Sequence, residues 1–202
     1  MRVIVVRHGK TELGASHRFQ SPNTPLSAQG AEAVMQCANT LAQERVTKVY
    51  TSGYQRAVET AQVIAKRHAL VPQEHKLFFE KYNSSAVIGR SYVSVPFLVL
   101  GLTTIAHLFV RQAKYKDEET LDELWERANE ARAYLSGEAK HEDTVIVVSH
   151  ALWIAAFLGA CEKERPRIIR YVILVLRALC MRNTQQYVLE LDNVTKAWKR
   201  LK

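Results

Sequence analysis

Arginine and histidine side chains follow two short apolar segments of this chain. Arg7 and His8 come directly after Val3–Val6, and a second histidine, His150, lies just beyond Thr144–Val148. Both segments are rich in β-branched residues, so they are predicted to be buried parallel strands. Ligands of open α/β sheets bind at the carboxyl ends of the strands, and the arginine fork matches the oxygens of a phosphate. The spacing therefore predicts a site for an oxyanion.

A third cationic group, Arg56, lies in the first turn of a predicted helix, Tyr54–His68. This helix follows a weaker predicted strand at Lys48–Tyr50, and Ser52 is expected to cap it. A cation near a helix N-terminus opposes the helix dipole, and a bound anion would remove that conflict. We therefore expect Arg56 to share the oxyanion site.

Helical patterns alternate with the predicted strands. Ser27–Glu44, with Ser27 as its N-cap, and Leu121–Leu135 carry apolar residues at helical spacing. Near the end of the chain, Tyr187–Leu191 and Thr195–Trp198 flank the turn residues Asp192-Asn193 and predict an antiparallel hairpin. The alternation predicts an α/β domain with a mostly parallel sheet and a C-terminal hairpin.

Size and composition limit what the chain could be. Its 202 residues, 48% of them apolar, suffice for one core, so we expect a single domain over residues 1–202 with a helical cap or insertion at about residues 81–117. The formal net charge of +8 favours anionic ligands. No basic run with interleaved aromatic residues appears, which argues against nucleic-acid binding.

Cysteine usage and the start of the chain bear on the compartment. The three cysteines, Cys37, Cys161 and Cys180, are odd in number and form no close-spaced pair, which argues against a zinc knuckle and against a disulfide framework. Val3–Val6 is too short for the apolar core of a signal peptide. We therefore expect a protein of the reducing cytoplasm.

Two apolar segments have no role in the oxyanion site. Val93–Val110 holds eighteen residues without a charge, which is long enough for a membrane span. A span there would separate His8 from His150, so we expect no span. We predict instead a helical cap or a homodimer contact, with surface membrane association as the alternative. A second apolar helix, Ile168–Met181, could pair with this segment or with a partner chain.

The sequence resembles the histidine phosphatase superfamily, also called phosphoglycerate mutase-like. The motifs that carry the resemblance are VVRHGKTE at Val5–Glu12, TPLSAQG at Thr24–Gly30, VYTSGYQRAVETA at Val49–Ala61, VIVVSHALWI at Val145–Ile154, and the late asparagine Asn183. They occur in the order that the family shows. The resemblance implies a three-layer α/β/α sandwich of the phosphoglycerate mutase-like type.

The resemblance also implies roles for the predicted site residues. His8 would be the nucleophile that carries a phosphoryl group, and Arg7, Arg56 and His150 would hold the phosphoryl oxygens. This agrees with the chemistry of the residues, because a neutral imidazole nitrogen attacks phosphorus while nearby cations stabilise charge on the oxygens. Such a site implies no metal and no cofactor.

A carboxylic acid from the middle of the chain would protonate the leaving oxygen. The family places its acid shortly after the second helix, which points to Glu80 in Leu77-Phe78-Phe79-Glu80. A carboxyl group among apolar neighbours keeps its proton more readily. Glu74 is the reserve candidate.

The substrate contacts are less well defined. Residues near the site that are expected to reach the substrate are Thr11, Gly14, His17, Arg18, Lys81 and Arg90. Gly14 stands where many members have asparagine, and its backbone amide is expected to take over that contact. Ala151 replaces the usual glycine after His150, and the stretch Lys81–Gly89 lacks the usual tryptophan and acidic pair.

These features favour a phosphomonoester hydrolase that acts through a phosphohistidine on a small phosphorylated metabolite. A phosphoglycerate mutase-type phosphotransferase is one alternative, although Val93–Val110 does not resemble the longer arginine-containing insertion of the family's mutases. A non-catalytic phosphate-binding module is the other. His8 discriminates between them, because binding alone does not require an imidazole there.

Overall fold

One six-stranded sheet forms the centre of the molecule. The computed structural model describes residues 1–16, 18–110, 113–138, 144–162, 165–192, 195 and 197–201. The strand order is β3-β2-β4-β1-β5-β6. The first four strands of that order pair in parallel, β5 is antiparallel to β1, and β6 is antiparallel to β5. The strands are β1 Arg2–Arg7, β2 Val46–Thr51, β3 Gln73–Glu74, β4 Thr144–Ser149, β5 Gln186–Leu191 and β6 Trp198–Arg200.

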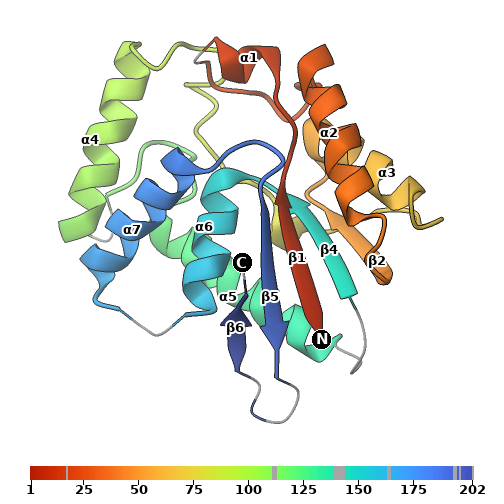
Figure 1. Ribbon diagram of the computed structural model, residues 1–202. Coiled ribbons are helices and arrows are strands. Elements are labelled where there is room, and N and C mark those ends of the chain that lie inside the picture. Colours follow the sequence, from red (N-terminus) through yellow and green to blue (C-terminus); the bar gives the residue numbers. More distant parts are fainter. Residues whose placement is uncertain are drawn as a thin grey trace.

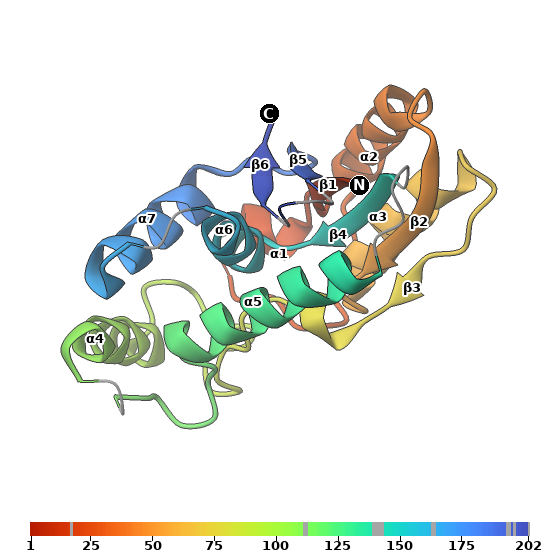
Figure 2. The ribbon, with the colours of Figure 1, turned by 90° about the horizontal axis from the view of Figure 1, so that it is seen from below.

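Helices cover both faces of this sheet (Figures 1 and 2). Helices α2 and α3 lie on one face, and α5 and α6 lie on the other, with α7 beside α6 and α4 beside α7. This is the three-layer sandwich predicted from the resemblance. The helices are α1 Glu12–Ala15, α2 Ala28–Leu41, α3 Gln55–Lys66, α4 Val95–Phe109, α5 Leu121–Gly137, α6 Ala151–Ala160 and α7 Arg167–Cys180, with a 3₁₀ helix η1 at Lys76–Phe78.

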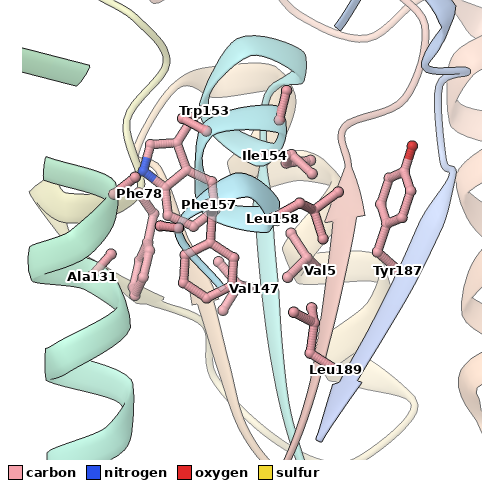
Figure 3. Close-up of a cluster of buried hydrophobic side chains, with 14 of the residues drawn as sticks. Val5, Phe78, Ala131, Val147, Trp153, Ile154, Phe157, Leu158, Tyr187 and Leu189 are labelled. Carbon is pink, nitrogen blue, oxygen red and sulfur yellow. The ribbon is translucent and has the colours of Figure 1, made fainter. Parts of the chain in front are cut away.

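Alternate residues of the central strands supply two separate cores. Val3 and Val5 of β1 face α5 and α6, whereas Ile4 and Val6 face α2 and α3. All four side chains are buried, which explains why the sequence of this strand is continuously apolar from Val3 to Val6. Figure 3 shows the first core, in which Leu158 of α6 lies beside Val5 and the aromatic side chains of α6 lie toward Phe78 and Val147. The cores hold β1 and β4 rigidly, so the residues at their carboxyl ends have fixed positions.

The observed elements confirm several predictions and correct others. Ser27 caps α2, because its hydroxyl accepts a hydrogen bond from the backbone N of Gly30 at 3.0 Å. The prediction that Ser52 caps the next helix was wrong: Gly53 turns the chain with φ 61°, and the N-cap of α3 is Tyr54. In the C-terminal hairpin, Thr195 lies in the turn, and β6 begins only at Trp198.

The two apolar segments both form helices, α4 and α7. Among the described residues, no helix is both long enough and apolar enough to cross a membrane. Both helices expose large apolar side chains, including Leu98 and Leu102 of α4 and Leu176 of α7. The division of the chain into one domain and a cap at about residues 81–117 stays a prediction, as do the homodimer contact and the compartment.

Candidate active site

The two histidines predicted for the oxyanion site lie side by side. Strands β1 and β4 are parallel neighbours, and their register pairs Arg7 with Ser149. His8 and His150 are the next residues along each strand, so their rings come together with centroids 4.9 Å apart. Both side chains are buried. His150 is also the N-cap residue of α6, which places it beside a helix N-terminus.

The ring of His8 is held in one protonation state. Nδ1 lies 2.6 Å from the backbone oxygen of Gly9, which can only accept, so Nδ1 carries the proton. Nε2 accepts a hydrogen bond from Nε of Arg56 at 3.3 Å. Burial, followed by the charges of Arg56 and Arg7, lowers the pKa of His8 well below its usual value. The imidazole is therefore neutral at physiological pH, with its free electron pair on Nε2.

Hydrogen bonds also fix the backbone that carries His8. The side chain of Asn183 donates to the backbone oxygen of His8 at 3.0 Å, and the backbone N of Gly9 donates to the hydroxyl of Thr60 at 3.1 Å. A Cβ at Gly9 would lie only 2.6 Å from a methyl group of Val34. Glycine is thus required here by the close approach of α2, and the turn after β1 has little freedom to move.

His150 is held by a residue whose role the sequence did not reveal. Oγ of Ser52 lies 2.6 Å from Nε2 of His150, and it also accepts a longer hydrogen bond, 3.5 Å, from the backbone N of Tyr54. Nδ1 of His150 is buried and has no hydrogen-bond partner among the described residues. Burial is the main cause that lowers the pKa of His150 well below its usual value, with Arg56 second. This ring is also neutral.

Two guanidinium groups, those of the buried Arg56 and the half-buried Arg7, give the site its positive charge. Arg56 donates to the backbone oxygen of Ser21 at 3.0 Å, and burial lowers its pKa to about 10, so it stays charged at physiological pH. Arg7 donates to the backbone oxygen of Met181, while its Nε is buried with no partner among the described residues. The nearby carboxylate of Glu80 raises the pKa of both arginines, which offsets part of the lowering caused by burial. The arrangement suits a dianionic group such as a phosphate monoester.

Glu80, the predicted acid, lies at this site. It lines one cavity of about 520 Å³ together with Arg7, His8 and Arg56. Its Oε1 accepts hydrogen bonds from two backbone N atoms, that of Lys81 at 2.9 Å and that of Trp153 at 3.1 Å. The reserve candidate, Glu74, is exposed on β3 and is absent from the lining of this cavity.

The residues predicted to contact the substrate are more scattered. Arg18 donates to the backbone oxygen of Gly89 at 3.2 Å and Arg90 to that of Ala86 at 3.1 Å, and neither lines the cavity. Lys81 does line it, but its Nζ forms a buried ion pair with Glu118 at 3.0 Å. His17 lies outside the described residues.

The amide of Gly14, which was expected to contact the substrate, forms a hydrogen bond within the chain. That amide donates to the hydroxyl of Thr11 at 3.0 Å, which caps the short helix α1. Neither residue lines the cavity. A Cβ at Gly14 would lie 2.7 Å from Nε2 of Gln20, so the side chain of Gln20 occupies the space beside this glycine. Gln20 lines the cavity and was missed, because nothing in the sequence links it to Gly14.

The sheet is mostly parallel, helices cover both of its faces, and histidines and arginines gather at the carboxyl ends of β1 and β4. Together these features define a phosphoglycerate mutase-like α/β protein. The chain belongs to the histidine phosphatase superfamily, branch 1, whose model matches residues 3–201. Membership was predicted from the sequence motifs and is confirmed.

Known proteins of similar sequence and structure agree with this assignment. A probable phosphoglycerate mutase, GpmB, from Serratia proteamaculans (strain 568) is 37% identical over 67 residues, which is 33% of this chain and 31% of that protein. The chain thus spans about a third of the length of the curated relatives that it matches. A mycobacterial glucosyl-3-phosphoglycerate phosphatase in complex with VO3 has a TM-score of 0.77 and 21% identity, covering 100% of this chain and 97% of the other.

A phosphoserine phosphatase from Entamoeba histolytica, in complex with phosphoserine, has a similar fold. Its TM-score is 0.78 at 15% identity, covering 100% of this chain and 95% of that chain. At these identities the two structural likenesses establish the fold alone.

Proposed function

We propose that the protein is a phosphomonoester hydrolase that works through a phosphohistidine on His8 and needs no metal ion. The observation that carries this proposal is the pair of contacts made by the two ring nitrogens of His8. Its Nδ1 proton is engaged by the backbone oxygen of Gly9, which leaves the electron pair of Nε2 directed toward Arg56 at 3.3 Å. A neutral, buried imidazole with an unprotonated Nε2 can attack phosphorus once a phosphoryl oxygen replaces Nε2 as the acceptor for Arg56.

The surrounding cations supply the stabilisation that a metal ion supplies elsewhere. As Nε2 of His8 bonds to phosphorus and the ester oxygen leaves, negative charge on the three equatorial oxygens is held by Arg7 and Arg56. In this mechanism we assign Ser52 as the donor to Nε2 of His150, which puts the ring proton of His150 on Nδ1. That N–H is the third donor to the phosphoryl oxygens, which accounts for its having no partner among the described residues.

Glu80 moves the proton in both halves of the reaction. In the first half its carboxylic acid protonates the leaving ester oxygen, and the alcohol departs. In the second half the resulting carboxylate takes a proton from water, whose oxygen attacks phosphorus and breaks the bond to Nε2 of His8. Inorganic phosphate and the neutral imidazole are restored. Both described hydrogen bonds to the carboxyl reach Oε1, which leaves Oε2 to carry the proton.

Turnover of an aryl phosphate tests this proposal. The wild type is compared with a His8→Gln variant and with His68→Gln, a matched control that alters a histidine outside the cavity lining. We expect turnover that survives a chelator, is abolished in His8→Gln and is retained in His68→Gln. Quenching during turnover should trap an acid-labile, base-stable phosphoenzyme. Loss of activity with chelator, or full activity in His8→Gln, would contradict the mechanism.

A second assay, with phosphoglycerates as substrates, separates hydrolysis from phosphotransfer. The curated relatives that match part of the chain are named as probable phosphoglycerate mutases. A mutase would convert one phosphoglycerate isomer into the other faster than it releases phosphate. We expect release of inorganic phosphate to dominate for every substrate tested. A non-catalytic module would bind phosphate esters and turn over none of them.

A further inference from the structure

The cavity at His8 is polar at one end and apolar along its walls. Arg7, His8 and Arg56 form the cationic end. Seven of the sixteen other lining residues belong to α4 and α7, which lie beside each other in Figures 1 and 2. The apolar residues that these two helices contribute to the lining are Leu100, Ile105, Val175, Ala178 and Leu179.

The polar lining residues Gln20, Asn83 and Tyr92 lie outside α4 and α7, so the part of the wall that these helices form offers few groups to a hydroxyl-rich or doubly charged substrate. The hydroxyl of Thr104 is occupied within its own helix, where it donates to the backbone oxygen of Leu100 at 2.8 Å. The ammonium of Lys81 is neutralised by Glu118, and both side chains are buried. The unpaired positive charge of the cavity is therefore concentrated at the His8 end, and the wall is suited to hydrocarbon.

The wall is also open at its outer end. Ile105 and Leu179 both line the cavity, yet 58% and 77% of their respective surfaces are exposed. An apolar side chain in such a position is stabilised if a ligand covers it. The cavity thus leads from the cationic end along α4 and α7 to an apolar opening.

A network of polar side chains fixes the two helices relative to each other. Arg167, at the start of α7, donates to the backbone oxygen of His107, near the end of α4, at 2.7 Å. It also donates to the carboxylate of Asp122 in α5 at 2.8 Å. Burial opposes ionisation of Asp122, but hydrogen bonds from Arg167 and Tyr171 lower its pKa to about 2. The wall is therefore built before a ligand arrives.

We propose that the substrate of this site is an amphiphilic phosphomonoester, in which the phosphate lies against His8 and an aliphatic chain lies along α4 and α7. The proposal rests on the phosphatase function proposed above and specifies its substrate class. Two properties of one cavity carry it: the cationic end selects the phosphate, and the continuous apolar wall selects the chain. A polar metabolite of the same size would leave the wall unused.

Chain length is the first test. A series of n-alkyl phosphates from ethyl to decyl is assayed at concentrations below micelle formation. We expect kcat/KM to rise by roughly threefold to fourfold for each added methylene until the wall is covered. A flat profile with active aryl phosphate turnover would overturn this inference and leave the phosphatase function standing. No turnover of any ester would overturn the phosphatase function itself.

Gly101 offers a direct way to block the wall. It lines the cavity, and a Cβ built there meets no atom within 4 Å, so a larger side chain can enter without a clash at its base. Leucine is also a better helix former than glycine, so Gly101→Leu should fold. The matched control is Gly137→Leu, at the end of α5, where a Cβ likewise meets nothing within 4 Å and which is outside the cavity lining.

We expect Gly101→Leu to lower kcat/KM for decyl phosphate by about tenfold or more, equivalent to the loss of two buried methylenes, and to leave ethyl phosphate unchanged. Gly137→Leu should leave both unchanged. An equal loss on both esters, or no loss on the long one, would overturn the inference. A parallel assay with vesicles that contain a lipid phosphate distinguishes a membrane lipid from a free ester as the source of the aliphatic chain. Turnover confined to vesicles would overturn binding of the monomeric ester along this wall.

Discussion

Oγ of Ser52 lies 2.6 Å from Nε2 of His150, and this contact holds a buried imidazole whose other nitrogen has no partner among the described residues. When this hydroxyl donates to Nε2, the ring proton of His150 lies on Nδ1. Ser52 reaches it because the left-handed turn at Gly53 delays the start of α3 and leaves the serine at the end of β2. In the proposed mechanism Ser52, a residue outside the cavity lining, thereby sets which nitrogen His150 directs at a phosphoryl oxygen.

Replacing Ser52 with alanine should therefore lower kcat with little change in KM. We expect about a tenfold loss, which corresponds to roughly 1.4 kcal/mol and is typical of one buried hydrogen bond. The matched control is Thr51→Val, which removes a buried hydroxyl that has no partner among the described residues. Steady-state kinetics and thermal melting of both variants give the comparison. Equal effects in the two variants would assign Ser52 a purely structural role.

Arg56→Lys keeps the positive charge but should still lower activity strongly. Lysine supplies a point charge, whereas the guanidinium of Arg56 offers several donors at fixed angles to His8 and to the phosphoryl oxygens. We expect kcat/KM for an aryl phosphate to fall by about 10² to 10³, and inhibition by orthovanadate to weaken in parallel. Arg67→Lys, at the exposed C-terminal end of the same helix, is the control. Retention of vanadate affinity in Arg56→Lys would remove Arg56 from the phosphate site.

Glu80→Gln should produce a defect that depends on the leaving group. An alkoxide needs a proton to depart, while nitrophenolate departs without one, so the variant should lose about 10² to 10⁴ in kcat on alkyl phosphates and much less on nitrophenyl phosphate. Glu74→Gln should behave as the wild type on both, since Glu74 is absent from the cavity lining. If Glu80→Gln lowered kcat by the same factor on alkyl and nitrophenyl phosphates, another group would be the acid.

The buried histidines predict how stability changes with pH. Burial lowers the folded-state pKa of both His8 and His150 well below their usual value of 6.5. The unfolded chain therefore binds more protons below about pH 6.5. Stability is fully present above that pH and is lost as the pH falls toward the folded-state values, by about 1.4 kcal/mol per pH unit for each histidine.

Urea denaturation at several pH values below 6.5 measures this slope. The double variant His8→Gln, His150→Gln should show a slope shallower by about 2.7 kcal/mol per pH unit over the same range. Carboxylates elsewhere contribute equally to both proteins and cancel in the difference. Identical slopes would mean that the two imidazoles take up protons in the folded protein as readily as in the unfolded chain.

Much of the site could be predicted because strand ends are visible in the sequence. The β-branched runs that become β1 and β4 identify the residues that follow them, and parallel strands bring their carboxyl ends to one edge. The position of Glu80 came from the family resemblance, and the structure places it in the same cavity as His8. Local pattern was sufficient where a residue's position depends only on the strand that precedes it.

Features that depend on distant partners could not be predicted. The charge of Lys81 is visible in the sequence, but its neutralisation by Glu118 arises only when the chain folds. The apolar character of α4 is equally visible, yet its position beside α7 depends on tertiary contacts at Arg167. Ser52 was assigned to a helix cap because its sequence neighbours fit one, while its actual partner, His150, comes from another strand.

The direct pairing of β1 with β4 has a consequence for how this protein could diversify. The two histidines are brought together by a register that is set within the sheet, while α4, in the chain between them, lies at the periphery. Exchanging α4 alone would alter what the molecule recognises and leave Arg56, Glu80 and the two histidines in place. Substrate selectivity and catalytic chemistry thus depend on different segments of the chain, so evolution or grafting could change the first without changing the second.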